Sequence, residues 1–451
     1  MKMSGAKMVI ESLHQEGVEV VFGYPGGAIM NVYDEIYKQN YFEHILNRHE
    51  QACVIAAEGY ARSTGKTGVA IVTSGPGFTN AITGIADAYM DSIPVVIISG
   101  QVPTTIIGTD GFQEIDAVGI SRPCTKHNYL VNKIEDLPRI IKEAFHLAST
   151  GRPGPVHVDI PKDITAQIGE FIYPSEVSMP TYKPTINYNK RQLKKAMEAI
   201  SNAKKPLLYI GGGAILSNCG YEIRDLAKKL NIPAVETLMA RGVMGDENPL
   251  FFGMLGMHGE YAANMAAHET DLLISLGARF DDRVTGRLDE FASKAKVIHI
   301  DIDPTSIAKL VVADYPIVGD LKLTVEAMIE DSENYEINDF SNWVELLKDY
   351  REKEPLRYID TDDLIKPQWP IQRVGKILGD NAIISTDVGQ HQMWTAQFFP
   401  FSHPRQWITS GGLGTMGFGL PAALGAARAF KGTNRVVVNF TGDGSILMNI
   451  Q

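Results

Sequence analysis

The sequence of 451 residues lacks most features of secreted, membrane-bound or nucleic-acid-binding proteins. Its three cysteines, Cys53, Cys124 and Cys219, lie far apart with no Cys-x-x-Cys pair, so neither a disulfide framework nor a cysteine zinc site is indicated. The net charge of -11 argues against nucleic acid or an anionic membrane surface as the main partner. No apolar run approaches the ~18 residues of a membrane span, and the segment Met1 to Ile10 lacks the apolar stretch of a signal peptide. These absences predict a cytoplasmic protein.

Several catalytic motifs are missing as well. The eleven histidines show no zinc-binding spacing, and Ser74 does not lie in the Gly-x-Ser-x-Gly turn of serine hydrolases. What is present is the composition of a globular protein, with 44% apolar and 21% charged residues. The length suffices for about three domains, each with its own core. The 42 glycines indicate many tight turns and close backbone approaches.

Short β-branched runs alternate with helical patterns along the chain. In residues 1–165 the expected strands are 18–22, 44–47, 69–73, 95–99 and 156–159. The alternation returns in residues 189–330, with strands at 206–210, 234–236, 272–276 and 297–301, and in residues 367–451, with strands at 383–385, 407–409 and 436–440. Apolar strands separated by helices predict an α/β fold of three doubly wound parallel-sheet domains, the third incomplete. A proline-rich linker at 161–188 and a polar connecting arm at 331–366, with one amphipathic stretch around 343–350, join them.

One acidic residue stands where an expected strand gives way to a buried helix. Glu50 follows Asn47-Arg48-His49 and precedes the apolar run Ala52–Ala57. A carboxyl group there is costly to bury unless it is paired or protonated, which suits it to moving a proton. Taken alone, the pattern favours a structural role, in which Glu50 pairs with Arg48 or caps the first turn of the helix.

Two glycine-rich turns have the composition of phosphate sites. Gly442-Asp443-Gly444-Ser445 follows an apolar strand, where glycines let the backbone approach a diphosphate and the aspartate can hold Mg²⁺. Gly211-Gly212-Gly213 follows another strand, but its spacing is not Gly-x-Gly-x-x-Gly. Tight turns and helix capping explain either motif as well as phosphate binding does.

Acidic and basic residues follow two further strands. Asp301 and Asp303 stand where a partner for a ribose diol would stand. Arg279 and Arg283 could clamp a carboxylate or phosphate, although the aspartates between them could instead pair with them.

The motifs occur in the order found in one known family. The segments concerned are Phe22–Gly27, Arg48–Gln51, Thr73–Gly77, Gly100–Pro103, Gly151–Pro155, Met254–Gly259, Arg279–Arg283, Asp387–His391 and Gly442–Ser445. With these, the sequence resembles the acetolactate synthase (acetohydroxyacid synthase) large subunit of the thiamine-diphosphate enzyme superfamily. The resemblance implies the thiamine-diphosphate-binding fold, with a pyrimidine-binding domain at 1–165, a central FAD-binding domain at 189–330 and a diphosphate-binding domain at 367–451.

The resemblance also implies cofactors, partners and an activity. Thiamine diphosphate, Mg²⁺ and FAD are the implied cofactors, with FAD in a structural role. A homodimer is implied, because in the family the thiamine cofactor lies between the first domain of one subunit and the third domain of another. A small regulatory subunit is a further implied partner. The implied reaction decarboxylates pyruvate and joins its hydroxyethyl group to a second 2-keto acid, in branched-chain amino-acid biosynthesis.

Residue roles follow from the same resemblance. Glu50 would share a proton with the aminopyrimidine of the cofactor. Residues lining the channel to this centre would be Gly27, Phe112, Gln113 and Lys126, and Arg283 would orient the acceptor's carboxylate. Positions matching the thiamine-diphosphate site are Gln390, His391, Gly414, Met416, Gly444 and Ser445, with Asp443 as metal ligand. Positions matching the flavin site are Arg152, Gly211, Gly212, Gly213, Thr237, Leu238, Met239, His258, Arg279, Asp301, Asp303 and Asp320.

One departure from the family concerns the end of the chain. The family's metal site needs an asparagine further along, whereas this chain stops at Gln451, shortly after Asp443. We therefore expect a fragment of an active enzyme that is inactive by itself. Pyruvate oxidase, oxalyl-CoA decarboxylase and glyoxylate carboligase share the fold, although the last lacks a carboxylate at the place of Glu50. A flavin- or nucleotide-binding module without catalysis, or a regulatory scaffold, is the alternative from another class.

Overall fold

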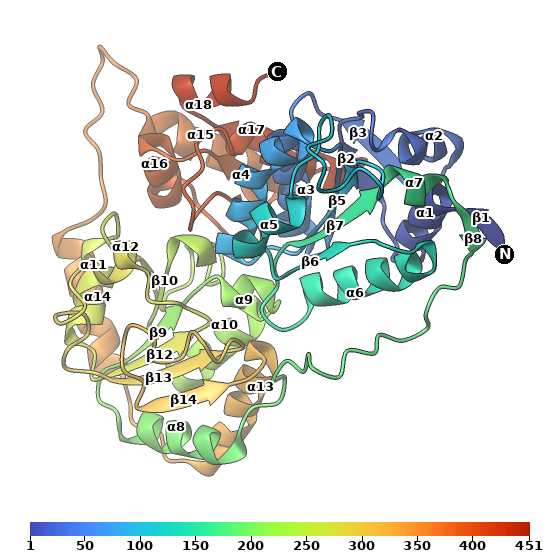
Figure 1. The fold of residues 1–451 in the computed structure, drawn as a ribbon. Coiled ribbons are helices and arrows are strands. Elements are labelled where there is room, and N and C mark those ends of the chain that lie inside the picture. Colours follow the sequence, from blue (N-terminus) through green and yellow to red (C-terminus); the bar gives the residue numbers. More distant parts are fainter. The chain divides into compact units, whose positions relative to one another are not determined.

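The computed structural model describes residues 1–451, and its chain forms two compact units (Figure 1). The first unit comprises Met1–Lys183, Ile384–Gly389 and Ile408–Gln451. The second comprises Pro184–Ile383 and Gln390–Trp407. No helix is long and apolar enough to cross a membrane.

A six-stranded parallel sheet forms the centre of the first unit, in the order β3-β2-β4-β5-β7-β6. Its strands are β2 (Val20–Gly23), β3 (Glu43–Leu46), β4 (Gly68–Val72), β5 (Val95–Gln101), β6 (His127–Leu130) and β7 (Val156–Pro161). A short antiparallel pair, β1 (Lys2–Ser4) with β8 (Ile168–Glu170), lies apart from it.

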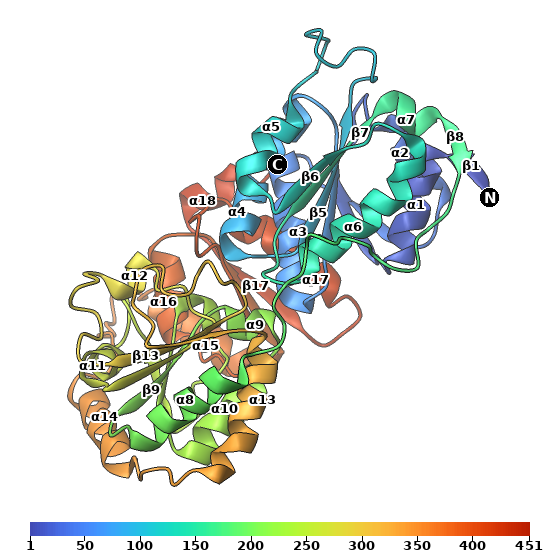
Figure 2. The same cartoon turned by 60° about the horizontal axis from the view of Figure 1, so that its bottom comes forward.

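Helices cover both faces of this sheet (Figure 2). One face carries α1 (Gly5–Gln15), α2 (Met30–Lys38), α6 (Leu137–Ser149) and α7 (Lys162–Ala166), and the other carries α3 (Glu50–Thr64), α4 (Pro76–Asp91) and α5 (Ala117–Ser121). Alternate strand residues such as Ile71 and Ile98 pack with Leu13 and Ile141 in the core under the first group. Their neighbours Ala70 and Ile97 are equally buried, which explains the continuous apolar strands.

Helix α3 is buried around almost its whole circumference, as the apolar run after Glu50 predicts. It packs against α17 (Gly419–Ala429) at the distance that two glycines allow. A Cβ atom on Gly59 would lie 2.2 Å from the carbonyl oxygen of Ala422, and one on Gly425 would lie 1.9 Å from that of Ala56. The backbones of α3 and α17 therefore touch without intervening side chains.

A third sheet has only three strands, in the order β16-β15-β17. They are β15 (Ala382–Thr386), β16 (Trp407–Ile408) and β17 (Val436–Phe440), and α18 (Asp443–Met448) follows β17.

The second unit contains another six-stranded parallel sheet, in the order β11-β10-β9-β12-β13-β14. Its strands are β9 (Pro206–Ile210), β10 (Ala234–Glu236), β11 (Phe251–Met254), β12 (Leu272–Leu276), β13 (Lys296–Asp301) and β14 (Tyr315–Val318). The chain starts in the middle, adds two strands on one side of β9 and then crosses to the other side. The order therefore reverses between β9 and β12, where such sheets bind ligands.

The helices of the second unit again form two layers around the sheet (Figure 2). One layer has α8 (Lys190–Asn202), α10 (Gly220–Leu230) and α13 (Leu321–Asp331), and the other has α11 (Tyr261–Glu269) and α14 (Ser341–Lys353). Helix α14 lies within the expected connecting arm, yet Trp343, Val344 and Leu347 are buried in the core beside the sheet. The amphipathic stretch expected around residues 343–350 of the arm is therefore a helix that packs on the second unit, because an amphipathic helix buries its apolar face.

Shorter elements complete the chain. The remaining α-helices are α9 (Gly213–Leu216), α12 (Asp282–Thr285), α15 (Gln368–Leu378) and α16 (Gln390–Phe398). Short 3₁₀ helices lie at Arg122–Cys124, Ile134–Asp136, Leu238–Ala240, Ser332–Asn334 and Gly379–Asn381. The predicted α/β class is confirmed, with three larger sheets besides the antiparallel pair β1–β8.

Candidate active site

Glu50 is the first residue of α3 and is only 7% exposed. Its Oε2 atom accepts a hydrogen bond from Asn80 Nδ2 on α4 at 3.0 Å, and Oε1 has no partner in the chain. The helix is capped by His49 instead, whose Nδ1 accepts the backbone N–H of Gln51 at 3.2 Å. Glu50 is therefore neither the N-cap residue nor a partner of Arg48, and one of its oxygens remains available to a ligand. No local sequence pattern indicates Asn80.

The loops beside Glu50 are lined by small residues. A Cβ atom on Gly77 would lie 3.1 Å from Glu50 Oε1 and 2.6 Å from Thr73 Cγ2. Around Gly27, by contrast, nothing lies within 4 Å of a built Cβ atom. The hydroxyl of Thr73 is buried without a hydrogen-bond partner. An available carboxylate oxygen, a free hydroxyl and an open glycine turn thus gather near the start of α3.

The segment carrying Gln113 lies over the turn that starts α4. A Cβ atom on Gly75 would lie 2.8 Å from the carbonyl oxygen of Gln113, so glycine is required there, and Gly75 has a φ of +57°. Gln113 is itself in the left-handed region, with a φ of +60°. Gln101 Nε2 fastens this segment by donating to the carbonyl oxygen of Ile115 at 2.9 Å.

Two other predicted channel residues differ in their surroundings. Phe112 is 90% exposed, an unusual state for a large apolar side chain. Lys126 donates from Nζ to the carbonyl oxygens of Leu147 and of Thr150, the latter at 2.8 Å. Its ammonium group thus caps the C-terminus of α6, and the structure does not bring it to Glu50.

A buried Ser-His-Asp cluster lies inside the first sheet. Ser99 Oγ is 2.7 Å from His157 Nε2 and donates to Asp159 Oδ1 at 2.6 Å, while His157 Nδ1 is 3.0 Å from Ser121 Oγ. In a nucleophilic triad the histidine lies between the serine and the acid, whereas here both contact the serine. Burial raises the pKa of Asp159 to about 7 and lowers that of His157 to about 3. The cluster is a buried core network and does not have the geometry of a nucleophilic triad.

A second group of predicted residues lies where β15, β16 and β17 end. Asp387 joins two of these loops, because Oδ1 accepts the N–H of Gly419 at 2.7 Å and Oδ2 accepts the hydroxyl of Thr441. A Cβ atom on Gly444 would lie 3.0 Å from Met416 Cε. The predicted residues Gly414, Met416, Asp443, Gly444 and Ser445 are all on these loops, and Gln390 and His391 begin α16. Asp443 is exposed and Ser445 is buried.

The loop at 410–415, which includes Gly414, is held by acidic residues of α4 that the sequence did not single out. Asp87 Oδ2 accepts the hydroxyls of Ser410, at 2.6 Å, and of Thr415. Asp91 accepts the N–H groups of Gly411 and Gly412 at 2.9 and 2.7 Å. This acidic pair therefore shapes the loop through its side-chain hydroxyls and its backbone.

Glu58 on α3 lies beside these acids, and Arg62 is the cation among them. Arg62 Nη2 lies 2.6 Å from Asp91 Oδ2 and donates from Nε to Glu58 Oε1 at 2.9 Å. Three carboxylates around one guanidinium leave excess negative charge. Burial above all, and then Asp87, raise the pKa of Glu58 well above its usual range, which keeps Glu58 protonated.

Replacing Glu58 with glutamine tests this protonation. The unfolded chain releases the Glu58 proton near pH ~4.3 while the folded chain retains it, so the free energy of unfolding falls as pH rises above that value. A glutamine has no proton to release and still accepts from Arg62. The melting temperature of Glu58→Gln minus that of the unsubstituted protein should therefore increase from pH 6 to pH 9. The exposed Glu247→Gln serves as control, and a difference that shrinks with pH would count against a protonated Glu58.

In the second unit, glycines bring the loops after β9 and β12 together at the switch point. A Cβ atom on Gly211 would lie 2.3 Å from the carbonyl oxygen of Gly277, and one on Gly213 would lie 2.7 Å from its Cα. A Cβ atom on Gly212 would lie 3.1 Å from Met239 Cβ. Close packing against Gly277 thus explains why residues 211 and 213 are glycines. Gly212 instead faces the residues that follow β10.

The other flavin positions within this unit also follow strand ends. Thr237, Leu238 and Met239 follow β10, His258 follows β11, Arg279 follows β12, Asp301 ends β13 with Asp303 beyond it, and Asp320 follows β14. Asp301 Oδ1 accepts the N–H of Asp303 at 2.9 Å, and Asp320 Oδ1 caps α13 through the N–H of Leu323 at 3.0 Å. Parallel strands place all these residues at one edge of the sheet. Arg152 belongs to the first unit, where its Nε donates to Ser92 Oγ at 2.8 Å.

The two predicted arginines flank a strained residue. Phe280 has a φ of +58° although it is not glycine, a conformation that costs on the order of 1–3 kcal/mol and is common at binding sites. Its ring is 1% exposed and is held edge-on by His299, with centroids 5.0 Å apart. Asp281 caps α12 by accepting the N–H of Arg283 at 3.0 Å, and the Arg283 side chain is exposed.

Family models identify the class of protein. Residues 3–120 match the N-terminal TPP binding domain of thiamine pyrophosphate enzymes, residues 193–328 their central domain and residues 387–451 their C-terminal TPP binding domain. The chain is therefore a thiamine-diphosphate enzyme in fold, and its sites for that cofactor are to be sought in the first and last of these segments.

Individual relatives narrow the family. The chain is 50% identical over 455 residues to the acetolactate synthase isozyme 3 large subunit of Escherichia coli, and 51% identical over 456 residues to the acetolactate synthase large subunit of Haemophilus influenzae. Both alignments cover 100% of this chain and 79% of the relative. A probable acetolactate synthase large subunit of Methanocaldococcus jannaschii is 48% identical over 459 residues, covering 100% of this chain and 77% of the relative. The chain belongs to the acetolactate synthase large-subunit family.

Proposed function

We propose that this chain is the catalytic subunit of an acetolactate synthase. It decarboxylates pyruvate and condenses the hydroxyethyl unit with a second 2-keto acid, pyruvate or 2-ketobutyrate, toward valine, isoleucine and leucine. The observation that carries the proposal is Glu50, a nearly buried carboxylate with Oε2 held by Asn80 and Oε1 without a partner in the chain.

Thiamine diphosphate would supply an electron sink for the decarboxylation when bound. The residues around Glu50 fit its aminopyrimidine, because Oε1 can exchange a proton with a ring nitrogen while Asn80 fixes the other oxygen. The buried hydroxyl of Thr73 is a further polar group without a partner. Gln390, His391, Gly414, Met416, Gly444 and Ser445 would hold the remainder of the cofactor.

Asp443 would hold a magnesium ion, which would neutralise charge on the diphosphate. The carboxylate of Asp443 is exposed at the mouth of β17, and oxygen is the donor that Mg²⁺ prefers. Glycines on either side of Asp443 leave room for a phosphate group beside it.

FAD would lie across the switch point of the second sheet. The proposed residues are those at its strand ends, from Gly212 and Thr237–Met239 to Arg279, Asp301 and Asp303. Arg152, which belongs to the first unit, stays a prediction for the flavin. The reversal of the strand order between β9 and β12, with Gly212 at that point, supports a dinucleotide.

Substrate would reach Glu50 past Gly27 and Gln113. Gly27 offers open space, and the exposed Phe112 offers an apolar wall. Arg283, with an exposed side chain, is proposed to orient the carboxylate of the acceptor. That Lys126 lines the same channel remains a prediction.

The assembly is proposed to be a homodimer with a small regulatory subunit, in the cytoplasm. The large-subunit names of the relatives support the second partner.

A pyruvate assay with the full-length protein tests the proposal. Release of CO₂ should require thiamine diphosphate and Mg²⁺, and the absorbance of bound FAD should remain that of the oxidised flavin under anaerobic conditions. Bleaching of the flavin by pyruvate would identify an oxidase instead, and flavin binding without CO₂ release would identify a binding module.

A further inference from the structure

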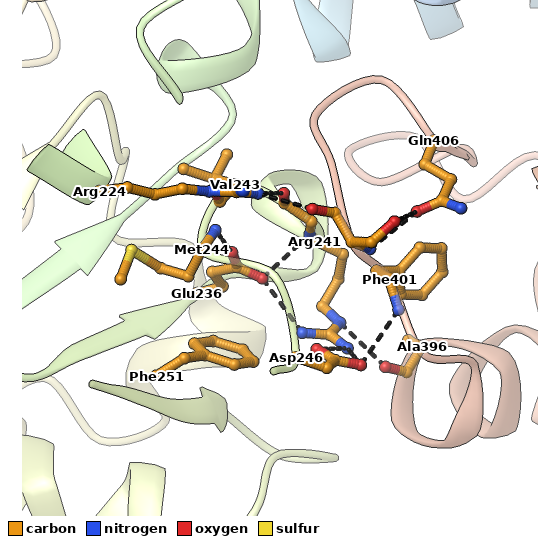
Figure 3. A network of polar contacts seen from close by, with 12 residues as sticks. Arg224, Glu236, Arg241, Val243, Met244, Asp246, Phe251, Ala396, Phe401 and Gln406 are labelled. Carbon is orange, nitrogen blue, oxygen red and sulfur yellow. Dashed lines mark hydrogen bonds and ion pairs between the residues drawn. The ribbon is translucent and has the colours of Figure 1, made fainter. Parts of the chain in front are cut away.

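The loop that follows β10 folds around one buried arginine (Figure 3). Arg241 is 2% exposed, and its Nη1 lies 3.1 Å from Glu236 Oε2. Its Nη2 donates to both carboxylate oxygens of Asp246, at 2.8 and 3.0 Å. The guanidinium also faces the rings of Phe251 and Phe401, with centroids 5.3 and 5.1 Å from Cζ. Two carboxylates and two aromatic rings thus fix its plane.

The remaining donor of Arg241 points to a distant part of the chain. Its Nε donates to the carbonyl oxygen of Ala396 at 3.0 Å, in the last turn of α16. Asp246 makes two further hydrogen bonds to the same segment. Its backbone N–H donates to the Phe401 carbonyl oxygen at 2.8 Å, and its side-chain Oδ2 accepts the Phe401 N–H at 3.1 Å. Arg224 adds a third tie, donating to the carbonyl oxygens of Gly242, at 2.9 Å, and of Ser402, at 2.8 Å.

Glu236, at the end of β10, stands at a position where dinucleotide-binding sheets often have a ribose-binding acid. In dinucleotide-binding sheets an acid at the end of the strand next to the first one takes the ribose hydroxyls. Here Glu236 Oε1 accepts the N–H of Met244 at 2.6 Å, and Oε2 accepts the N–H of Gly242 at 3.2 Å as well as Arg241. Both oxygens are used within the protein. The acid therefore orients Arg241 and is not available to a ribose.

The network lies between two proposed cofactor segments. Thr237–Met239, proposed for the flavin, directly follows Glu236. Gln390 and His391, proposed for thiamine diphosphate, begin the helix whose last turn Arg241 holds. A helix of nine residues spans only about 13 Å and is stiff, so a bond at its C-terminal turn fixes the direction of its N-terminal end.

We propose that Arg241 is a positioning residue that links the flavin loop to α16, so that binding of FAD strengthens binding of thiamine diphosphate and the reverse. The inference rests on the proposed function. Release of α16 from the loop would leave the carbonyl oxygen of Ala396 without its Arg241 donor and Asp246 Oδ2 without the N–H of Phe401, so the loop and the helix order together. The cofactor that binds first supplies that ordering, and the second then binds at a smaller entropic cost.

The test measures dissociation constants with the full-length protein, by flavin fluorescence for FAD and by calorimetry for thiamine diphosphate with Mg²⁺. We expect FAD to lower the dissociation constant for thiamine diphosphate about tenfold in the unsubstituted protein, within the usual range of coupling between sites. In Arg241→Lys this factor should fall below about twofold, because lysine keeps the charge beside Glu236 and Asp246 but lacks the planar fork that also reaches Ala396. The affinity for FAD alone should change little.

The matched control is Arg351→Lys. Arg351 is a half-buried arginine of the same unit that lies over the ring of Phe252, 4.6 Å from its centroid, and contacts no part of α16. It should keep the tenfold factor. The inference is overturned if the unsubstituted protein binds both cofactors without coupling, or if FAD still lowers the dissociation constant for thiamine diphosphate about tenfold in Arg241→Lys. Either result leaves the proposed function intact. A protein that binds neither cofactor overturns the proposed function and this inference with it.

Hydrogen exchange supplies a second test that needs no variant. Adding FAD without thiamine diphosphate should slow amide exchange several-fold in residues 394–401 of the unsubstituted protein. Unchanged exchange there, in a protein shown to bind FAD, contradicts the link.

Discussion

Replacing Glu50 with glutamine is expected to slow C2 proton exchange of bound thiamine diphosphate by about two to four orders of magnitude, the range that a positioned proton-transfer group contributes. Glutamine matches the size of glutamate and can still accept from Asn80, but it cannot take up or return a proton. FAD should remain bound, because its proposed residues lie at the strand ends of the second sheet. Quenched-flow hydrogen–deuterium exchange followed by NMR measures the rate.

Glu143→Gln is the matched control for Glu50→Gln. Glu143 is also a nearly buried glutamate of the first unit, but it bonds Arg139 and Tyr129 on the opposite face of the sheet. Its substitution should leave the exchange rate unchanged. If exchange in Glu50→Gln is as fast as in the unsubstituted protein, Glu50 has only a structural role at the start of α3.

Replacing Gly425 with serine should destabilise the first unit by about 3 kcal/mol or more. A Cβ atom there would lie 1.9 Å from the carbonyl oxygen of Ala56, which is backbone and cannot rotate away. Helices α3 and α17 would have to separate, and overpacking of this kind costs roughly 1–3 kcal/mol and at times more. Because α3 begins with Glu50 and contacts α17 along its length, affinity for thiamine diphosphate should fall together with stability.

Ala427→Ser on the exposed side of the same helix is the control for Gly425→Ser. Thermal unfolding followed by circular dichroism should show a change within about 0.5 kcal/mol for the control. Equal melting temperatures for the two variants would contradict the close packing of the two helices.

The central strands could be predicted from the sequence because they are apolar on both faces. The predicted strands 206–210, 234–236 and 272–276 match β9, β10 and β12 residue for residue, and 436–440 matches β17 although that strand lies at the edge of its sheet. The strands β6, β11 and β14, which were not predicted, all lie at sheet edges. An edge strand is covered less completely and tolerates residues such as Pro316 in β14, so its sequence lacks the apolar run.

The candidate site divides along similar lines. Glu50 could be found because a carboxylate next to a buried helix is unusual in a local sequence window. Asn80 could not, since it lies 30 residues further on and reaches Glu50 only through the packing of α3 on α4. The contact of Arg241 with Ala396 spans 155 residues, and its two ends carry no common local pattern. Side chains that act on one another across the fold require the structure.

The most direct test of the central claim is the identity of the product. Full-length protein with thiamine diphosphate, Mg²⁺, FAD and [2-¹³C]pyruvate should give, by ¹³C NMR, acetolactate in which two labelled carbons are bonded to each other. This coupling arises only if the two-carbon unit from one pyruvate is transferred to the keto carbon of another. Labelled acetate or acetaldehyde in place of acetolactate would contradict the account.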